Sequence, residues 1–388
     1  MKFKGNSPFY VACFFKAFAQ MTLVTGLPFL AIRLGAGPIQ LGMLGSATMG
    51  VYTVTCLSLS KWVDRLRPKM LVMTALALAC LVALAVSTAR SVGVLILLAG
   101  LDGFLSALYW PLVMAWLGRR SAETELTRHL GLFNLSWSSG VPIGTVAAGY
   151  LFEIRPALPF YVSAFMVLVT LFVIAHVPKQ STLHRDERIS TAPAESPERR
   201  RRSGKRYFLY LAWLSMLASF FTIWNVRYQL PKRAIDAGMG EGEIALFLFV
   251  MSIAQLLLFL VLARSDAWQF RFRYIFLAHF MSAMSMLLVF FSLSQLSLFI
   301  AMILFGVGNG IVYFSSLYYG MALQTVRGRN AAIHESTIGA GFLLGAFGGG
   351  LLAEHWNLAM PYLFCLGLIS LAAVAWLPAA WRERSAIH

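Results

Sequence analysis

The sequence predicts an all-α polytopic membrane protein with twelve transmembrane helices. Three observations carry this prediction: the composition, a series of long apolar runs and an internal repeat. Of the 388 residues, 59% are hydrophobic and 12% are charged, whereas an average soluble domain has about 25% charged residues. So few charges cannot cover a water-exposed surface. This excludes an ordinary soluble enzyme, a disordered chain and a nucleic-acid-binding domain, despite the net charge of +16.

The apolar runs have the length of membrane-crossing helices. A hydrocarbon core about 30 Å thick is crossed by about 20 residues of apolar helix. Runs of this length predict spans at residues 9–32, 39–62, 70–89, 93–117, 130–152, 157–177, 207–229, 243–263, 273–293, 297–323, 332–354 and 358–379. Because their number is even, we expect both termini on the same side of the membrane.

A polar segment, residues 178–206, separates the sixth span from the seventh. It is rich in Pro, Ser and Arg, a composition typical of a flexible linker. We therefore expect an N-terminal six-helix bundle (1–177), a cytoplasmic basic linker (178–206) and a C-terminal six-helix bundle (207–388). The run Arg199 to Arg202 fits an orientation signal or a lipid-headgroup contact better than a nucleic-acid site.

Lys and Arg are concentrated in the loops that share a side with the N-terminus, and this asymmetry places that side in the cytoplasm. We expect a multi-pass protein of the bacterial cytoplasmic (inner) membrane with both termini in the cytoplasm, surrounded by membrane lipids and monomeric. The four cysteines lie in apolar runs, without CxxC or metal-ligand spacing. No metal and no cofactor is expected.

The two halves repeat one another. The glycines of the eleventh span have the spacing of those in the fifth: Gly140, Gly144 and Gly149 against Gly341, Gly345 and Gly350. The loop LGAGPIQLGML, which starts at Leu34, likewise corresponds to AGMGEGEIALF, which starts at Ala237. Two parallel six-helix repeats related by an axis along the membrane normal are the architecture of one large transporter class.

With these spans, linker and repeat, the chain resembles the major facilitator superfamily over nearly its whole length. The loop after the second span matches that family's Gly-x-x-x-Asp-Arg-x-Gly-Arg-Arg-like motif at Asp64, Arg65 and Lys69, and departs from it at Ser60, Arg67 and Pro68. The resemblance implies the family's fold, and it implies that Asp64 holds the outward-facing state by docking near the start of the eleventh span. The alternative is a solvated turn that only anchors the topology.

The fifth span resembles the exporter-type glycine motif of the same family at Gly131, Gly140, Gly144 and Gly149, although Thr145 follows Gly144 where the motif has Pro. The resemblance slightly favours export. Close helix packing accounts for the same glycines.

Ionisable residues inside spans are costly and are therefore site candidates. Asp102, between Gly100 and Gly103 near the membrane midplane, is a candidate proton- or cation-binding carboxylate, or a structural hydrogen-bond partner. Lys16 either reaches the bundle interior or extends to the headgroups. We expect Arg227 to extend to the headgroups and His279 to be packed or lipid-facing.

His334 and Glu335 begin the eleventh span, and Glu335 aligns with Asn134 in the repeat. They are candidates for proton coupling or for ordinary helix-end residues. Amide and aromatic side chains in the first, fourth, seventh and tenth spans are candidates for lining a solute path. They are Gln20, Tyr109, Trp110, Trp224, Asn225, Asn309, Tyr313 and Tyr318.

We expect a secondary active transporter that moves a small organic solute by alternating access, coupled to protons. The chain lacks the GxxxxGK[ST] loop of ATP-binding proteins, and no set of catalytic residues stands out, so no enzyme is expected. Lys16 and Arg227 suit an anionic solute, whereas Asp102 suits a cation or a proton. The alternatives are an uptake carrier for sugars or carboxylates and a non-transporting sensor or scaffold.

Overall fold

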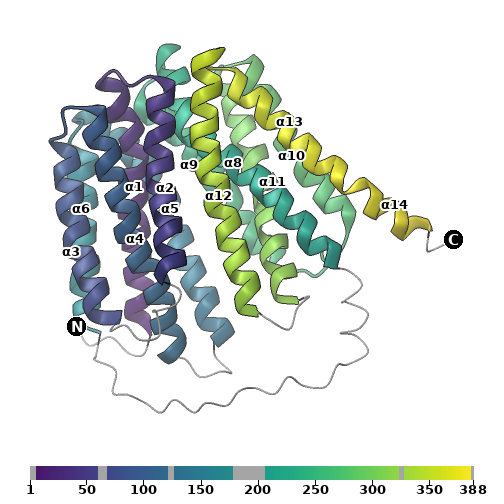
Figure 1. The fold of residues 1–388 in the computed structure, drawn as a ribbon, viewed down its shortest axis with the longest axis horizontal. Helices are drawn as coiled ribbons and strands as arrows, with labels where there is room; N and C mark the ends of the chain where they lie inside the picture. The colour runs from purple at the N-terminus through teal and green to yellow at the C-terminus, as the bar shows by residue number, and fades with distance from the viewer. Residues whose placement is uncertain (1–5, 60–67, 121–125, 178–205, 323–326, 386–388) are drawn as a thin grey trace.

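The computed structural model describes residues 6–59, 68–120, 126–177, 206–322 and 327–385, and these residues form helices without any strand. Twelve long helices pack side by side, and the short α14 (Leu377–Ser385) projects away from them beyond α13 (Met360–Ala375) (Figure 1). The N-terminal half contains α1 (Ser7–Arg33), α2 (Pro38–Leu59), α3 (Pro68–Ser87), α4 (Val92–Arg120), α5 (Leu126–Ile154) and α6 (Leu158–Ala175). The C-terminal half contains α8 (Arg206–Asp236), α9 (Glu241–Leu262), α10 (Phe272–Phe291), α11 (Gln295–Ala322), α12 (Arg327–His355), α13 (Met360–Ala375) and α14 (Leu377–Ser385).

The twelve long helices correspond to the twelve predicted spans. Within the described residues, 11 helices are long and apolar enough to cross a membrane, and the more polar α5 occupies the remaining position. The predicted seventh span, 207–229, is too short, because α8 continues to Asp236. Its last turns are buried against the other half, where Gln229 donates a hydrogen bond to the Pro38 carbonyl oxygen at 3.1 Å.

Proline marks several helix starts, because it lacks the N–H that a first helical turn leaves unbonded and its backbone angle already suits a helix. α2 begins at Pro38 and α3 at Pro68, while α1, α6 and α13 carry Pro in their first two positions. The turns after α1 and α8 are also alike: Gly35 and Gly238 have φ of 83° and 90°, a left-handed conformation that favours glycine.

The repeat seen in the sequence is present in the packing. A Cβ on Gly144 of α5 would lie 2.3 Å from the Phe18 carbonyl oxygen of α1, and a Cβ on Gly345 of α12 would lie 2.2 Å from the Phe221 carbonyl oxygen of α8. Both are the same contact in the two halves. At these positions only glycine lets the two helix backbones approach so closely.

Glycines also join the halves, again as a symmetric pair. Gly149 of α5 lies against Ala245 of α9, and Gly350 of α12 lies against Gly42 of α2. Extensive packing between the halves in the described residues is limited to α2 with α12, α5 with α9, and α8 with α1 and α2. The structure therefore consists of two parallel, pseudo-symmetric six-helix bundles.

The two ends of the molecule differ. We call the end where α1 and α5 finish and α2 and α9 begin the closed end, because the halves contact each other there. We call the other end, where α1 and α8 begin, the terminal end. Figure 1 shows the helices of the halves approaching at the closed end, at the top, and diverging toward the terminal end. The predicted linker 178–206 lies, apart from Arg206, outside the described residues.

Candidate functional site

A buried polar group lies in the N-terminal half, where α1 faces α4. Lys16 of α1 and Asp102 of α4 are 2% and 3% exposed. The Lys16 ammonium donates a hydrogen bond to Ser106 Oγ at 3.3 Å, one turn along α4 from Asp102. The two charges are within electrostatic reach, while Asp102 Oδ2 has no hydrogen-bond partner. Lys16 thus points into the bundle rather than to the headgroups.

Amide and aromatic groups extend this pair along the same two helices. Trp110 Nε1 donates to Gln20 Oε1 at 2.8 Å. The Tyr109 ring lies 5.9 Å from the Lys16 ammonium and packs edge-on against Trp110. The α1–α4 interface therefore presents a mixed wall of charge, amide and aromatic groups, which suits binding of a small amphipathic solute.

The C-terminal half contains the equivalent interface without the charges. Ser219 of α8 donates to Asn309 Oδ1 of α11 at 2.7 Å, in the positions that correspond to Lys16 and Ser106. Phe305 occupies the position that corresponds to Asp102. The repeat therefore conserves a polar contact between equivalent helices but places the ion pair in one half only.

Two aromatic residues of α8 reach across to the N-terminal half. Trp224 Nε1 donates to the Gly45 carbonyl oxygen of α2 at 3.3 Å, and its ring packs against that of Phe342, tilted by 31° with centroids 3.7 Å apart. Tyr228 also packs against Gly45 and is within electrostatic reach of Asp102. The site in the N-terminal half is thus covered by side chains of the C-terminal half.

Arg227 differs from the prediction. It does not extend to the headgroups; it is 7% exposed, and its Nη2 donates to Ser252 Oγ of α9 at 3.4 Å. The reason is tertiary: α8 continues past residue 229, so Arg227 lies about nine residues inside the helix end.

His279 is packed inside the C-terminal half, where its Nδ1 hydrogen-bonds the Ile275 carbonyl oxygen.

Glu335 and His334 lie apart from the Lys16–Asp102 pair. Glu335 is exposed, yet it is within electrostatic reach of Tyr52 of α2 and Tyr313 of α11. It therefore faces the space between the halves on the terminal side. His334 is buried and bonded to Ser316 Oγ at 3.0 Å, so it is not exposed at a helix end.

Other candidates lie away from the centre. Asn134 is exposed and accepts a bond from Trp137 Nε1 at 3.0 Å. Asn225 points within the C-terminal half toward Cys365 Sγ, at 3.6 Å. The Tyr318 hydroxyl donates to Gln269 Oε1 at 2.5 Å, within an aromatic cluster at the terminal end.

Of the predicted gating loop, only Lys69 can be placed. Its ammonium donates to the carbonyl oxygens of Ala175 and Val177, at 2.7 and 2.5 Å. These are carbonyl groups at the end of α6, a position where a cation is favourable. Lys69 thus ties α3 to α6 within the N-terminal half. Asp64 and Arg65 lie outside the described residues.

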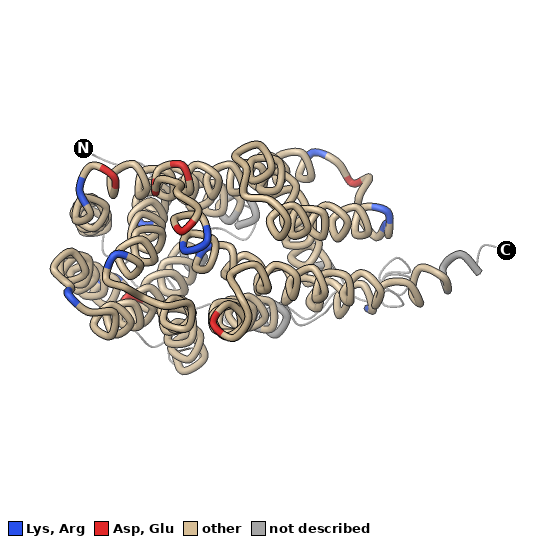
Figure 2. Tube along the Cα trace, turned by 90° about the horizontal axis from the view of Figure 1, so that it is seen from above, with Lys and Arg blue, Asp and Glu red and all other residues tan. Residues whose placement is uncertain are grey.

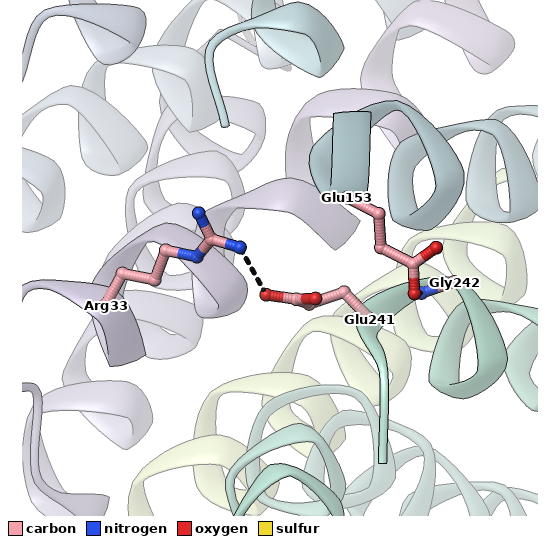
Figure 3. Close-up of polar contacts among 4 residues, drawn as sticks. All are labelled: Arg33, Glu153, Glu241 and Gly242. Atoms are coloured by element: carbon pink, nitrogen blue, oxygen red, sulfur yellow. Dashed lines mark hydrogen bonds and ion pairs between the residues drawn. The ribbon is translucent and has the colours of Figure 1, made fainter. Parts of the chain in front are cut away.

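Charged contacts between the halves at the closed end were not anticipated from the sequence. Arg33 Nη2 of α1 lies 2.9 Å from Glu241 Oε1 of α9, and Glu153 Oε1 of α5 accepts a bond from the Gly242 backbone N–H at 2.8 Å (Figure 3). The symmetric Glu354 carboxylate lies against Gly37. Seen from above, charges are few and gather mostly near helix ends (Figure 2).

The described residues contain no group of three or more His, Cys, Asp or Glu side chains that could hold a metal ion. What they contain is a buried polar group in one of two repeated six-helix bundles, with Tyr228 of the other bundle in electrostatic reach of it. This combination defines the class of secondary transporters built from parallel repeats.

Comparison with known proteins agrees with this class. The family model described as "Major Facilitator Superfamily" matches residues 9–332, and the chain belongs to this family. As a member of this family it is a membrane transporter of the secondary type rather than an enzyme. No match was found among curated protein sequences.

Solved structures with the same fold include the nucleoside transporter NupG, with a TM-score of 0.74 and 12% identity over 97% of this chain and 99% of that one. A bacterial homologue of the human lysosomal transporter Spinster, described as inward-facing and occupied, has a TM-score of 0.74 and 12% identity over 96% of each chain. Its inward-facing, unoccupied form has a TM-score of 0.66 and 15% identity over 96% of this chain and 93% of that one. At these identities the similarity shows the fold alone.

Proposed function

We propose that the protein moves a small organic solute by alternating access and couples this movement to protons. The observation that carries the proposal is Asp102, a buried carboxylate near the middle of the membrane with one oxygen lacking a partner. It lies beside Lys16 and within electrostatic reach of Tyr228 from the opposite half. Asp102 keeps Lys16 as a neighbour, whereas Tyr228 moves away when the two halves move apart. A carboxylate in such a changing environment is suited to binding and releasing a proton once per cycle.

The conformational part of the proposal follows from the asymmetry between the two ends. When the closed end opens, Trp224 and Tyr228 must leave α2, and water then reaches the neighbourhood of Asp102 from the other side. The proton affinity of Asp102 depends on its hydration and on the distance to Lys16. The change of conformation therefore changes the occupancy of the proton site, which is the requirement for coupling.

The location is part of the same proposal. We propose the cytoplasmic membrane with both termini in the cytoplasm, a monomer in contact with lipids, because Lys and Arg are concentrated on that side. The closed end then faces outward, and the structure represents an inward-facing state. The glycines of α5 supply no argument for export, because their counterparts in α12 make the same packing contacts.

Asp102→Asn in reconstituted vesicles tests the proposal. Because an amide cannot carry the proton, gradient-driven accumulation of solute should fall to background, while exchange of labelled for unlabelled solute continues. The matched control is Asp236→Asn: Asp236 is an exposed aspartate paired with Lys232 one turn away, and its variant should transport normally. Unchanged proton-driven accumulation by Asp102→Asn would remove this residue from the mechanism.

Wild-type vesicles that move none of a broad solute panel would favour the sensor or scaffold alternative.

A further inference from the structure

Arg227 is a buried cation that lacks a counter-charge. It lies about nine residues, roughly 14 Å, inside the closed end of α8. A guanidinium has five N–H donors; here Ser252 Oγ accepts one hydrogen bond, at 3.4 Å, and Nη1 has no partner. Among the described residues, no carboxylate pairs with it. Within the described part of the chain, the electrostatic interaction found for Arg227 is with the adjacent Tyr228.

A second arginine of the same helix shows how a structural arginine is satisfied in this protein. Arg233 donates from Nη1 and Nη2 to the carbonyl oxygens of Val289 and Phe290, at 2.5 and 2.9 Å, and lies over the Tyr362 ring. These hydrogen bonds and the ring contact satisfy the Arg233 guanidinium without any ligand. The described residues offer Arg227 no comparable set of partners.

The buried charges of the centre do not cancel. Among the buried side chains that the structure describes, Lys16 and Asp102 offset one another across the α1–α4 interface, and Arg227 is left as an excess positive charge. An uncompensated buried charge costs several kcal/mol, and such a residue within a span is a functional candidate. A negatively charged ligand would supply the missing partner.

We infer that Arg227 binds the anionic oxygen group, carboxylate or phosphate, of the small organic solute. This inference rests on the proposed function and specifies its substrate class. The planar guanidinium matches two oxygens of such a group, and Ser252 holds Nη2 so that Nη1 remains for the ligand. Tyr228 has electrostatic interactions with both Arg227 and Asp102, which places the anion site beside the polar group of α1 and α4.

Trp224 ties α8, the helix that carries Arg227, to the opposite half. It lies one turn nearer the terminal end on α8, where it packs against Phe342 and donates a hydrogen bond to the Gly45 carbonyl oxygen of the opposite half. Arg227 itself is 7% exposed in this state. Opening of the closed end breaks the Trp224–Gly45 contact and moves α8 away from α2, and the anion site becomes accessible in that conformation.

The test compares matched solutes that differ in charge, using the full-length protein in detergent. Thermal unfolding is measured over a concentration series of benzoate against benzamide and of phenyl phosphate against phenol, at constant ionic strength. Ligand binding to the folded state raises the unfolding temperature. At least one anion should stabilise the wild type, and its neutral partner should bind about tenfold or more weakly, as loss of one charge-assisted bond implies.

Three variants locate the effect. Arg227→Met should fold and should lose the preference for the anion, and Arg227→Lys should retain part of it. The matched control Arg233→Gln, on the same helix, should keep the full preference even if its unfolding temperature is lower. Anion binding by Arg227→Met at wild-type strength would overturn the inference. So would a wild type that responds to no anion.

The two proposals can fail separately. Stabilisation of the wild type by benzamide or phenol, without any preference for the anions, refutes the anion site and leaves a neutral-solute transporter standing. An anion preference that depends on Arg227, combined with no solute movement in vesicles, supports the binding site and refutes the proposed transport.

Discussion

Lys16 and Asp102 each reduce the cost of the other's charge inside the membrane. They are on neighbouring helices at positions offset by about one turn, and Ser106 supplies the direct hydrogen bond to the ammonium. Removal of one member of a directly bonded buried pair costs about 3–5 kcal/mol, because the remaining charge stays buried without compensation. Lys16 and Asp102 have no direct hydrogen bond, so we expect removal of one of them to destabilise the protein by less than this.

Lys16→Met is therefore expected to destabilise the protein by on the order of 2 kcal/mol. Adding Asp102→Asn should recover part of the loss, because the double variant leaves no buried charge at this position. Thermal unfolding of the wild type, both single variants and the double variant forms a cycle that isolates the interaction. Strictly additive effects would show that the two charges do not interact.

Among single residues, the sequence located Lys16 and Asp102 but could not choose between their alternatives. The direction of a side chain depends on which helix face meets a neighbour. For Arg227 the same uncertainty produced a wrong prediction, since the burial of the last turns of α8 comes from contacts with the other half. Tyr228, which approaches Asp102 across the interface, carried no signal in the sequence.

At the level of helices, the N-terminus of α9 acts as a docking point for the other half. The carboxylate of Glu153 accepts a backbone N–H from its first turn, and Arg33 pairs with Glu241 at its first residue. A carboxylate at a helix N-terminus is stabilised by the unbonded N–H groups and the helix dipole. These contacts exist only while the closed end is shut.

The double variant Arg33→Gln/Glu153→Gln should consequently shift the protein toward states in which the closed end is open. Exposed ion pairs contribute about 0.2–1 kcal/mol and helix-end contacts a similar amount, so the shift should be several-fold. It is measured as faster modification of Thr25→Cys, a buried position of α1, by a membrane-impermeant thiol reagent.

The control is Lys232→Gln, which removes a charge at the same end that pairs within its own helix. Its modification rate should match that of the unaltered background. An equal rate in the double variant would show that the Glu153 and Arg33 contacts do not hold the closed end.

For the whole molecule, the symmetry of the two bundles determines which contacts can alternate. α2 packs on α12 as α5 packs on α9. These two interfaces between the halves are therefore related by one pseudo-twofold axis. Rocking about this axis opens one end as it closes the other. The side on which each end lies decides whether the state is inward- or outward-facing.

We expect labelling to place both termini and the segment 178–206 on the cytoplasmic face. The reason is the concentration of Lys and Arg in these segments and in the loops on the same side. Single cysteines introduced at Ser196 and at Ala237, an exposed residue of the turn after α8, should be modified from opposite sides of sealed vesicles. Modification of both from one side, or of Ser196 from outside, would contradict the orientation.

The sequence alone determined the number of helices, their division into two repeats and the family, because apolar run length and repeated glycines are local properties of the chain. Only the tertiary structure decided which polar groups meet. Helices that are far apart in sequence bring Lys16 to Ser106, Trp224 to Gly45 and Glu153 to Gly242. They also bury Arg227 with no carboxylate partner among the residues that the structure describes. Contact across helices depends on rotation and tilt, which the hydrophobicity of a span does not specify.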